Sequence, residues 1–231
     1  MTSIAANLQA VRERIAAACL AAGRPGDAVG LLAVSKTWPA NSIGEAAAAG
    51  QRAFGENYVQ EAVDKIAALA GTPLEWHFIG PLQSNKTRLV AENFAWVHSV
   101  DRLKVAERLA TQRPVGLPPL NLCLQVNVSG EASKSGCSPA EAPALASAIR
   151  RLDGVSLRGL MAIPEPSDDV SLQRRRFATL RATLEQINAE SAAGLDTLSM
   201  GMSDDLEAAI MEGATIVRVG TAIFGQRDYS I

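Results

Sequence analysis

The sequence has few of the residues that mark metal and disulfide sites. Only two of its 231 residues are histidine and three are cysteine. Neither His77 nor His98 has a carboxylate or cysteine partner at a metal-ligand spacing, which argues against a metal centre. An odd number of cysteines without metal-type spacing is typical of reduced thiols in a cytosolic protein. We therefore expect a cytoplasmic protein that holds no metal.

The sequence also has no excess of charge and no long apolar run. Its formal net charge of −2 gives no general attraction to nucleic acid or to a membrane surface. No apolar run approaches the roughly 20 residues of a membrane-spanning helix. Charged residues at positions 12–14 interrupt the apolar N-terminal stretch, whose apolar residues recur at helical spacing: Ile4, Leu8, Val11 and Ile15. This pattern predicts an amphipathic helix over residues 3–22 and not a leader peptide.

Eight short apolar segments alternate with helical patterns along the rest of the chain. The segments are residues 29–34, 52–54, 75–80, 95–100, 120–128, 156–164, 196–201 and 214–220. The expected helices between them include residues 58–69, 102–113, 170–191 and 204–212. The alternation and the length predict an α/β fold, a (β/α)₈ TIM barrel with an extra N-terminal helix, as one domain over residues 1–231. An open doubly wound sheet is the alternative, but the first strand-to-helix turn has no glycine fingerprint for a dinucleotide.

In a barrel of parallel strands, the residues that follow the strands share one rim, where function is concentrated. Lys36 follows the first strand, and partial desolvation there would lower its pKa and free its amine to form an imine. A surface lysine in a strand-to-helix turn is the simpler interpretation, and this stretch alone favours it.

The loops after the seventh and eighth strands are where such barrels often hold a phosphate. Ser203 stands before an expected helix start, where it could cap the helix or bind an anion. Gly220 permits close backbone approach, and Thr221 adds an N–H and a hydroxyl. Alternation along the eighth strand places Arg218 inside the barrel, either paired with a core carboxylate or in contact with a ligand.

Several motifs together resemble one family over almost the whole chain. They are AVSKTWP around Lys36, FGENYVQE (54–61), WHFIGPLQSNK (76–86), QVNVSGEASKSG (125–136), GLMAIP (159–164) and LSMGMSDDLEAAIMEGATIVRVGTAIFG (198–225). In order and spacing they resemble the pyridoxal 5′-phosphate (PLP) homeostasis proteins, the YggS/PROSC family. That family in turn resembles the N-terminal barrel of alanine racemase, a fold-type III PLP-binding barrel.

The resemblance implies a bound cofactor, PLP, attached covalently to Lys36 as a Schiff base. It further implies that Ser203 and the Gly220–Thr221 turn hold the phosphate and that Arg218 faces the pyridine nitrogen. The surroundings of the ring are expected to include Asn57, His77 and Met161.

The resemblance also implies a role in intracellular PLP homeostasis without robust catalysis. Alanine racemase needs a second base, a tyrosine from a C-terminal β-domain, and this sequence ends at Ile231 without that domain. We therefore expect a non-catalytic carrier, a monomer or weak dimer, whose partners are PLP and candidate apo PLP-dependent enzymes. The alternatives are a PLP-dependent racemase or decarboxylase of narrow specificity and, from another class, a cofactor-free Schiff-base aldolase.

Overall fold

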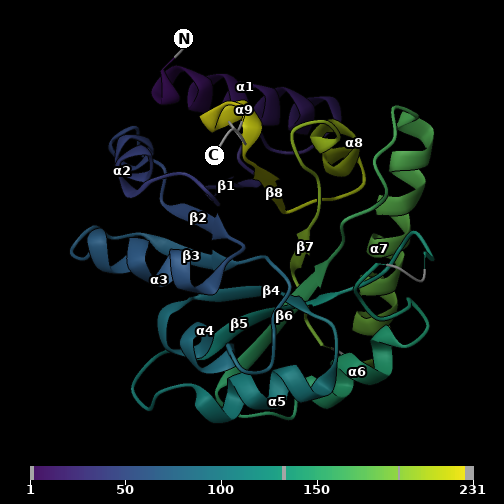
Figure 1. Cartoon of the computed structure of the whole chain (residues 1–231). Helices are drawn as coiled ribbons and strands as arrows, with labels where there is room; N and C mark the ends of the chain where they lie inside the picture. Colours follow the sequence, from purple (N-terminus) through teal and green to yellow (C-terminus); the bar gives the residue numbers. More distant parts are fainter. Residues whose placement is uncertain (1–2, 132–133, 192, 227–231) are drawn as a thin grey trace.

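The chain forms a closed barrel of eight parallel strands surrounded by helices (Figure 1). The computed structural model describes residues 3–131, 134–191 and 193–226. The strands are β1 (Gly30–Val34), β2 (Ala53–Glu56), β3 (Glu75–Phe78), β4 (Trp96–Val100), β5 (Leu120–Gln125), β6 (Val155–Met161), β7 (Thr197–Ser199) and β8 (Ile216–Val219). The expectation of a (β/α)₈ barrel is confirmed.

The barrel closes where the first strand meets the last. β1 pairs in parallel with β8 from Gly30↔Ile216 to Ala33↔Val219, and with β2 on its other side. Because every pairing is parallel, the carboxyl ends of all eight strands lie at one opening of the barrel. This opening is the rim on which the expected functional residues should meet.

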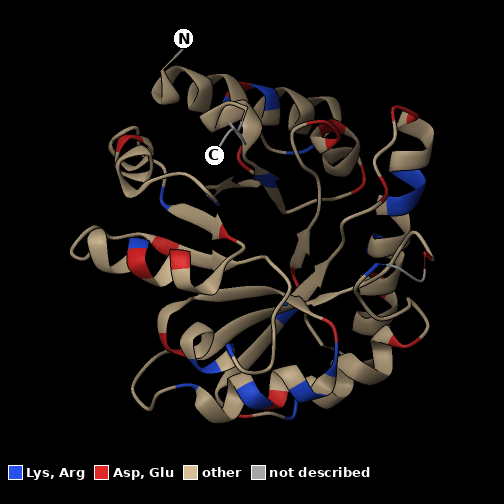
Figure 2. Ribbon diagram, in the orientation of Figure 1, with Lys and Arg blue, Asp and Glu red and all other residues tan. Residues whose placement is uncertain are grey.

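The helices cover the outside of the barrel. They are α1 (Ile4–Ala21), α2 (Ala40–Ala48), α3 (Val59–Ala68), α4 (Thr87–Asn93), α5 (Leu103–Gln112), α6 (Ala142–Ile149), α7 (Val170–Ser191), α8 (Leu206–Met211) and α9 (Thr221–Phe224). Figure 2 shows residues of both charge signs on α3, α5 and α7, so these helices present a mixed surface. No helix in the described ranges has both the length and the apolar character needed to cross a membrane.

Helix α1 is the extra N-terminal helix that the sequence predicts. Its buried residues, Leu8, Val11, Ile15, Ala18 and Cys19, follow helical spacing. Ser3 caps the helix, accepting a hydrogen bond from the Ala6 N–H at 3.2 Å. The buried face packs against α8 and α9, which lie beside α1 in Figure 1. Helix α1 therefore packs against the two segments that follow β7 and β8.

The element boundaries differ from the sequence prediction mainly at the rim. β5 ends at Gln125 and not at residue 128, because the Asn127 N–H donates to the Cys137 carbonyl (2.8 Å) in the following loop. β6 ends at Met161 although the apolar run continues to Pro164. The one-turn helix α9 was not expected, since a run of four residues has too little periodicity to identify.

Candidate functional site

A cavity of ≈ 220 Å³ lies at the carboxyl ends of the strands. Six of the eight site residues expected from the sequence line it: Lys36, Asn57, Ser203, Arg218, Gly220 and Thr221. They follow or end β1, β2, β7 and β8, which are far apart in the chain but neighbours around the closed barrel. The remaining lining consists of residues that were not expected at the cofactor site: Val34, Ile79, Ile163, Met202 and Asp204.

The residues on both sides of Lys36 are held by a buried charged cluster. The Ser35 hydroxyl donates to Glu56 Oε1 at 2.7 Å, and Lys65 Nζ donates to the Ser35 carbonyl at 2.9 Å. On the other side, the Thr37 N–H donates to Glu61 Oε1 at 2.6 Å, with Thr37 in the left-handed region at φ 69°. A non-glycine residue persists in that region only where its surroundings hold it there. The backbone that carries Lys36 is therefore fixed from both directions.

Arg218 lies inside the barrel, as strand alternation predicts, and is only 4% exposed. Its Nη1 donates to the Ser199 carbonyl (2.6 Å) and hydroxyl (2.9 Å), and its Nη2 donates to the Ala162 carbonyl (2.9 Å). Burial lowers the pKa of the guanidinium to about 10, with the Asp205 carboxylate acting in the opposite direction. Arg218 therefore remains a cation at neutral pH, held by oxygen acceptors at one side of the cavity.

Asn57 brings an unsatisfied acceptor to the cavity. Its Oδ1 is buried and has no hydrogen-bond partner among the described residues. A Cβ on Gly80 would lie 2.2 Å from the Asn57 carbonyl oxygen, so only glycine lets the two backbones approach so closely. Because a buried acceptor without a partner is costly, Asn57 Oδ1 is suited to a ligand that carries a donor.

The loop between β7 and α8 brings Ser203 to the cavity. Helix α8 begins at Leu206 with Asp205 at its N-cap, so Ser203 is not the cap that the sequence offered as one possibility. The Met202 N–H donates to Asp205 Oδ1 at 2.6 Å. Arg14 of α1 donates to the Ser203 carbonyl at 3.1 Å. These contacts secure the loop from both of its sides and leave the Ser203 side chain at the cavity.

His77 and Met161, the other two expected site residues, are not part of this lining. Met161 is fully buried and packs with Trp96 and Cys123. His77 is 2% exposed, stacks on the Trp96 ring with centroids 5.5 Å apart, and hydrogen-bonds to other side chains. Burial lowers its pKa, so its imidazole is neutral near pH 7. Both residues lie deeper in the barrel, and the cavity gives no support to their expected contact with the cofactor.

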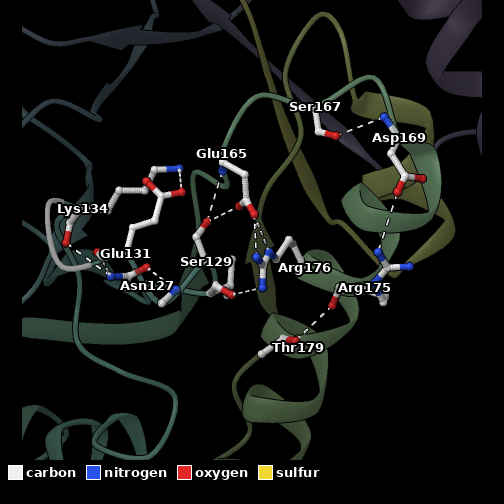
Figure 3. Close-up of polar contacts among 12 residues, drawn as sticks. Asn127, Ser129, Glu131, Lys134, Glu165, Ser167, Asp169, Arg175, Arg176 and Thr179 are labelled. Carbon is white, nitrogen blue, oxygen red and sulfur yellow. Dashed lines mark hydrogen bonds and ion pairs between the residues drawn. The ribbon is translucent and has the colours of Figure 1, made fainter.

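A second cavity, of ≈ 230 Å³, adjoins the first and shares Asn57, Ile79 and Ile163 with it. Part of its wall is the loop after β5, which carries Lys134 and Ser135. The contacts that fix the start of this loop are drawn in Figure 3.

The ion pair between Glu165 and Arg176 holds the start of that loop (Figure 3). Arg176 of α7 donates to Glu165 Oε1 at 2.6 Å and to the Val128 carbonyl at 3.3 Å. The Ser129 hydroxyl donates to the other Glu165 oxygen. The hydrogen bond from Arg176, followed by the one from Ser129, lowers the pKa of Glu165 to about 2 against the effect of desolvation. The loops after β5 and β6 are thus fastened to α7.

Comparison with known proteins decides the family. The family model for the alanine racemase N-terminal domain matches residues 2–228. The chain belongs to this family. Within it, a Pseudomonas aeruginosa protein named pyridoxal phosphate homeostasis protein is 65% identical and aligns over 99% of this chain and 98% of its own. The protein of that name from Escherichia coli K12 is 56% identical over 100% and 99%. The resemblance to the pyridoxal phosphate homeostasis proteins is confirmed.

Solved structures agree with this assignment. PipY of Synechococcus elongatus, solved with PLP bound, superposes with a TM-score of 0.86 at 41% identity and covers 96% of this chain and 100% of its own. Alanine racemase from Corynebacterium glutamicum superposes with a TM-score of 0.69 at 16% identity, over 96% of this chain and 62% of the racemase. The second likeness concerns the fold alone.

Proposed function

We propose that this protein binds PLP covalently through Lys36 and serves in PLP homeostasis, holding and delivering the cofactor without turning over amino acids itself. The observation that carries the proposal is the convergence of Lys36, Arg218, Ser203 and Thr221 on one cavity. The homologous PipY, solved with PLP bound, supports the choice of ligand.

The residues present fit PLP by their chemistry. PLP supplies an aldehyde that condenses with a primary amine, an aromatic ring and a phosphate. Lys36 supplies the amine, while Ser203 and Thr221 supply donors for the phosphate. The unsatisfied Asn57 Oδ1 could accept a hydrogen bond from the ring hydroxyl of PLP.

Arg218 is the residue that argues for binding without turnover. A guanidinium at the ring nitrogen disfavours protonation of that nitrogen, since two positive charges would meet. The ring is then a weaker electron sink than one paired with an acidic residue. The described lining also contains one carboxylate, Asp204, and no tyrosine or histidine that could act as a second base.

Identification of the modified lysine tests the covalent proposal. The protein is incubated with PLP, reduced with borohydride and digested, and the labelled peptide is identified by mass spectrometry. We expect the label on Lys36. The control variant Lys104→Ala, at an exposed position of α5, should label like the wild type. Predominant labelling of another lysine in the wild-type protein would refute the proposal.

The carrier role has its own experiment. PLP-loaded protein is mixed with an apo PLP-dependent enzyme in the presence of a trap for free PLP, and recovery of enzyme activity is timed. We expect recovery beyond that given by free PLP under the same conditions. Recovery no faster than with free PLP would count against delivery, and sustained turnover of an amino acid by the protein itself would favour the racemase or decarboxylase alternative.

A further inference from the structure

Five side chains form a continuous hydrogen-bonded line through the inside of the barrel. Glu75 Oε1 lies 2.8 Å from His77 Nε2, and His77 Nδ1 lies 2.9 Å from His98 Nε2. His98 Nδ1 lies 2.7 Å from the Ser199 hydroxyl, which accepts from Arg218 Nη1 at 2.9 Å. The line starts at the amino end of β3, where the Glu75 side chain is 51% exposed, and ends at the cavity that Arg218 lines. It therefore connects the two openings of the barrel.

The position of every proton in this line follows from the charge of Glu75. The hydrogen bond with His77 lowers the pKa of Glu75, so the carboxylate is ionised and can only accept. His77 must then carry its proton on Nε2 and, since burial keeps it neutral, must accept at Nδ1. That acceptor requires a proton on His98 Nε2, and His98 is neutral because burial holds its pKa well below the usual value. His98 Nδ1 accordingly accepts from the Ser199 hydroxyl.

All four hydrogen bonds thus run in the same direction, from the Arg218 cation to the Glu75 anion. The Ser199 hydroxyl has a single proton, and donating it to His98 leaves the oxygen free to accept from Arg218. Arg218 forms no ion pair with any residue that the structure describes. Asp205 acts on Arg218 only through its electrostatic field. The hydrogen-bonded line therefore supplies a second negative group, Glu75, at the end far from Arg218.

The geometry points to a role for Glu75, His77, His98 and Ser199 as positioning residues that hold Arg218 in its orientation toward the cavity. Both histidines are neutral with the proton on Nε2, so every hydrogen bond of the line is donated in the direction of Glu75. The consequence for PLP binding rests on the proposed function, whereas the proton positions do not. In this arrangement His77 acts on the site through three intervening hydrogen bonds.

The proton positions can be measured without PLP. The sequence has two histidines, so a long-range ¹H–¹⁵N spectrum of untagged protein contains two imidazole patterns. At neutral pH we expect both to be the Nε2–H tautomer. A proton on Nδ1 of either ring, or an imidazolium form of either ring, would overturn the proposed arrangement of protons in the hydrogen-bonded line.

Two variants break the line at different points. Glu75→Leu removes the acceptor that fixes the tautomers, so Nδ1–H forms should appear in both rings together, because only one proton can lie between His77 and His98. Ser199→Ala should leave both tautomers unchanged, since Glu75 still sets them. The control Glu107→Leu changes an exposed carboxylate on α5 and should alter neither ring.

Binding of PLP then tests the positioning role. Both Glu75→Leu and Ser199→Ala should weaken equilibrium PLP binding on the order of tenfold, by analogy with metal-binding side chains that lose an outer hydrogen-bond partner. Circular dichroism and the midpoint of thermal unfolding show that each variant is folded. Wild-type affinity in both variants would overturn the positioning role. Failure of the wild-type protein to take up PLP would overturn the proposed function. The tautomers of the two histidines would still decide whether the hydrogen-bonded line has the proposed proton positions.

Discussion

Lys65 is the buried cation beside the strand end that carries Lys36. Its Nζ contacts Glu56 Oε1 at 2.8 Å, Glu61 Oε1 at 2.5 Å and the Ser35 carbonyl at 2.9 Å. The side chain of Glu56 is completely buried, and burial raises its pKa. Removing one partner of a buried ion pair leaves the other charge uncompensated, which typically costs 3–5 kcal/mol.

We therefore expect Lys65→Met to lower the free energy of unfolding by roughly 3–5 kcal/mol, measured by urea denaturation. The matched control is Arg88→Met, which breaks an exposed i,i+4 pair with Glu92 at 4.0 Å. That change should cost less than about 1 kcal/mol. Equal losses in the two variants would show that the cluster around Lys65 does not support β1 and β2.

The sequence indicated some of these residues better than others. Lys36, Ser203 and Thr221 were predictable because each follows a strand, and parallel strands in a barrel end at one rim. Lys65 lies on the same helical face as buried Ala62, so helical spacing could have revealed it. The place of His77 could not be predicted, because the line it joins depends on pairing between strands whose residues are far apart in the chain.

At the scale of elements, the Glu165–Arg176 pair joins the loop after β6 to α7 and, through Ser129, to the loop after β5. The folded-state pKa of Glu165, about 2, lies below the value of about 4.3 for an unperturbed glutamate. A depressed pKa contributes stability that is present above pH 4.3 and is lost as the pH falls toward 2.

Glu165→Gln should therefore be less stable than the wild type at pH 7, and the difference should shrink as the pH falls from about 4.3 to 2. Urea denaturation at several pH values measures this difference. The control is Asp169→Asn, which alters an exposed carboxylate 3.8 Å from Arg175. Its difference from the wild type in free energy of unfolding should change less over the same pH range. A constant offset for Glu165→Gln would mean that Glu165 does not titrate as the structure indicates.

The order of elements was predictable and their ends were not. Alternating apolar and helical segments predict the eight strands, because each strand of a parallel barrel is covered on both faces. The ends of β5 and β6 depend on loop contacts, such as that between Asn127 and Cys137, which local composition does not show. Helix α9 follows from the way the chain leaves β8 and packs on α1.

At the scale of the whole molecule, the three thiols report on three layers of the fold. Cys19 lies on the buried face of α1, Cys123 lies inside the barrel, and Cys137 lies in the loop after β5. All three are buried and unpaired with one another. Burial raises the pKa of Cys123 to about 12 and of Cys137 to about 11, and it also raises that of Cys19.

Because the thiolate is the reactive form, none of the three should react with a thiol reagent such as DTNB in the native protein within minutes, and all should react at once in urea. Over longer times, labelling of a buried thiol in the native protein requires local opening of the structure around it. Mass spectrometry can show in which order the three cysteines are labelled. We expect Cys137 first, because opening its loop leaves the barrel closed, and Cys123 last, because reaching it requires separation of the strands. Labelling of Cys123 before Cys137 would mean that the barrel opens more readily than the loop at its rim.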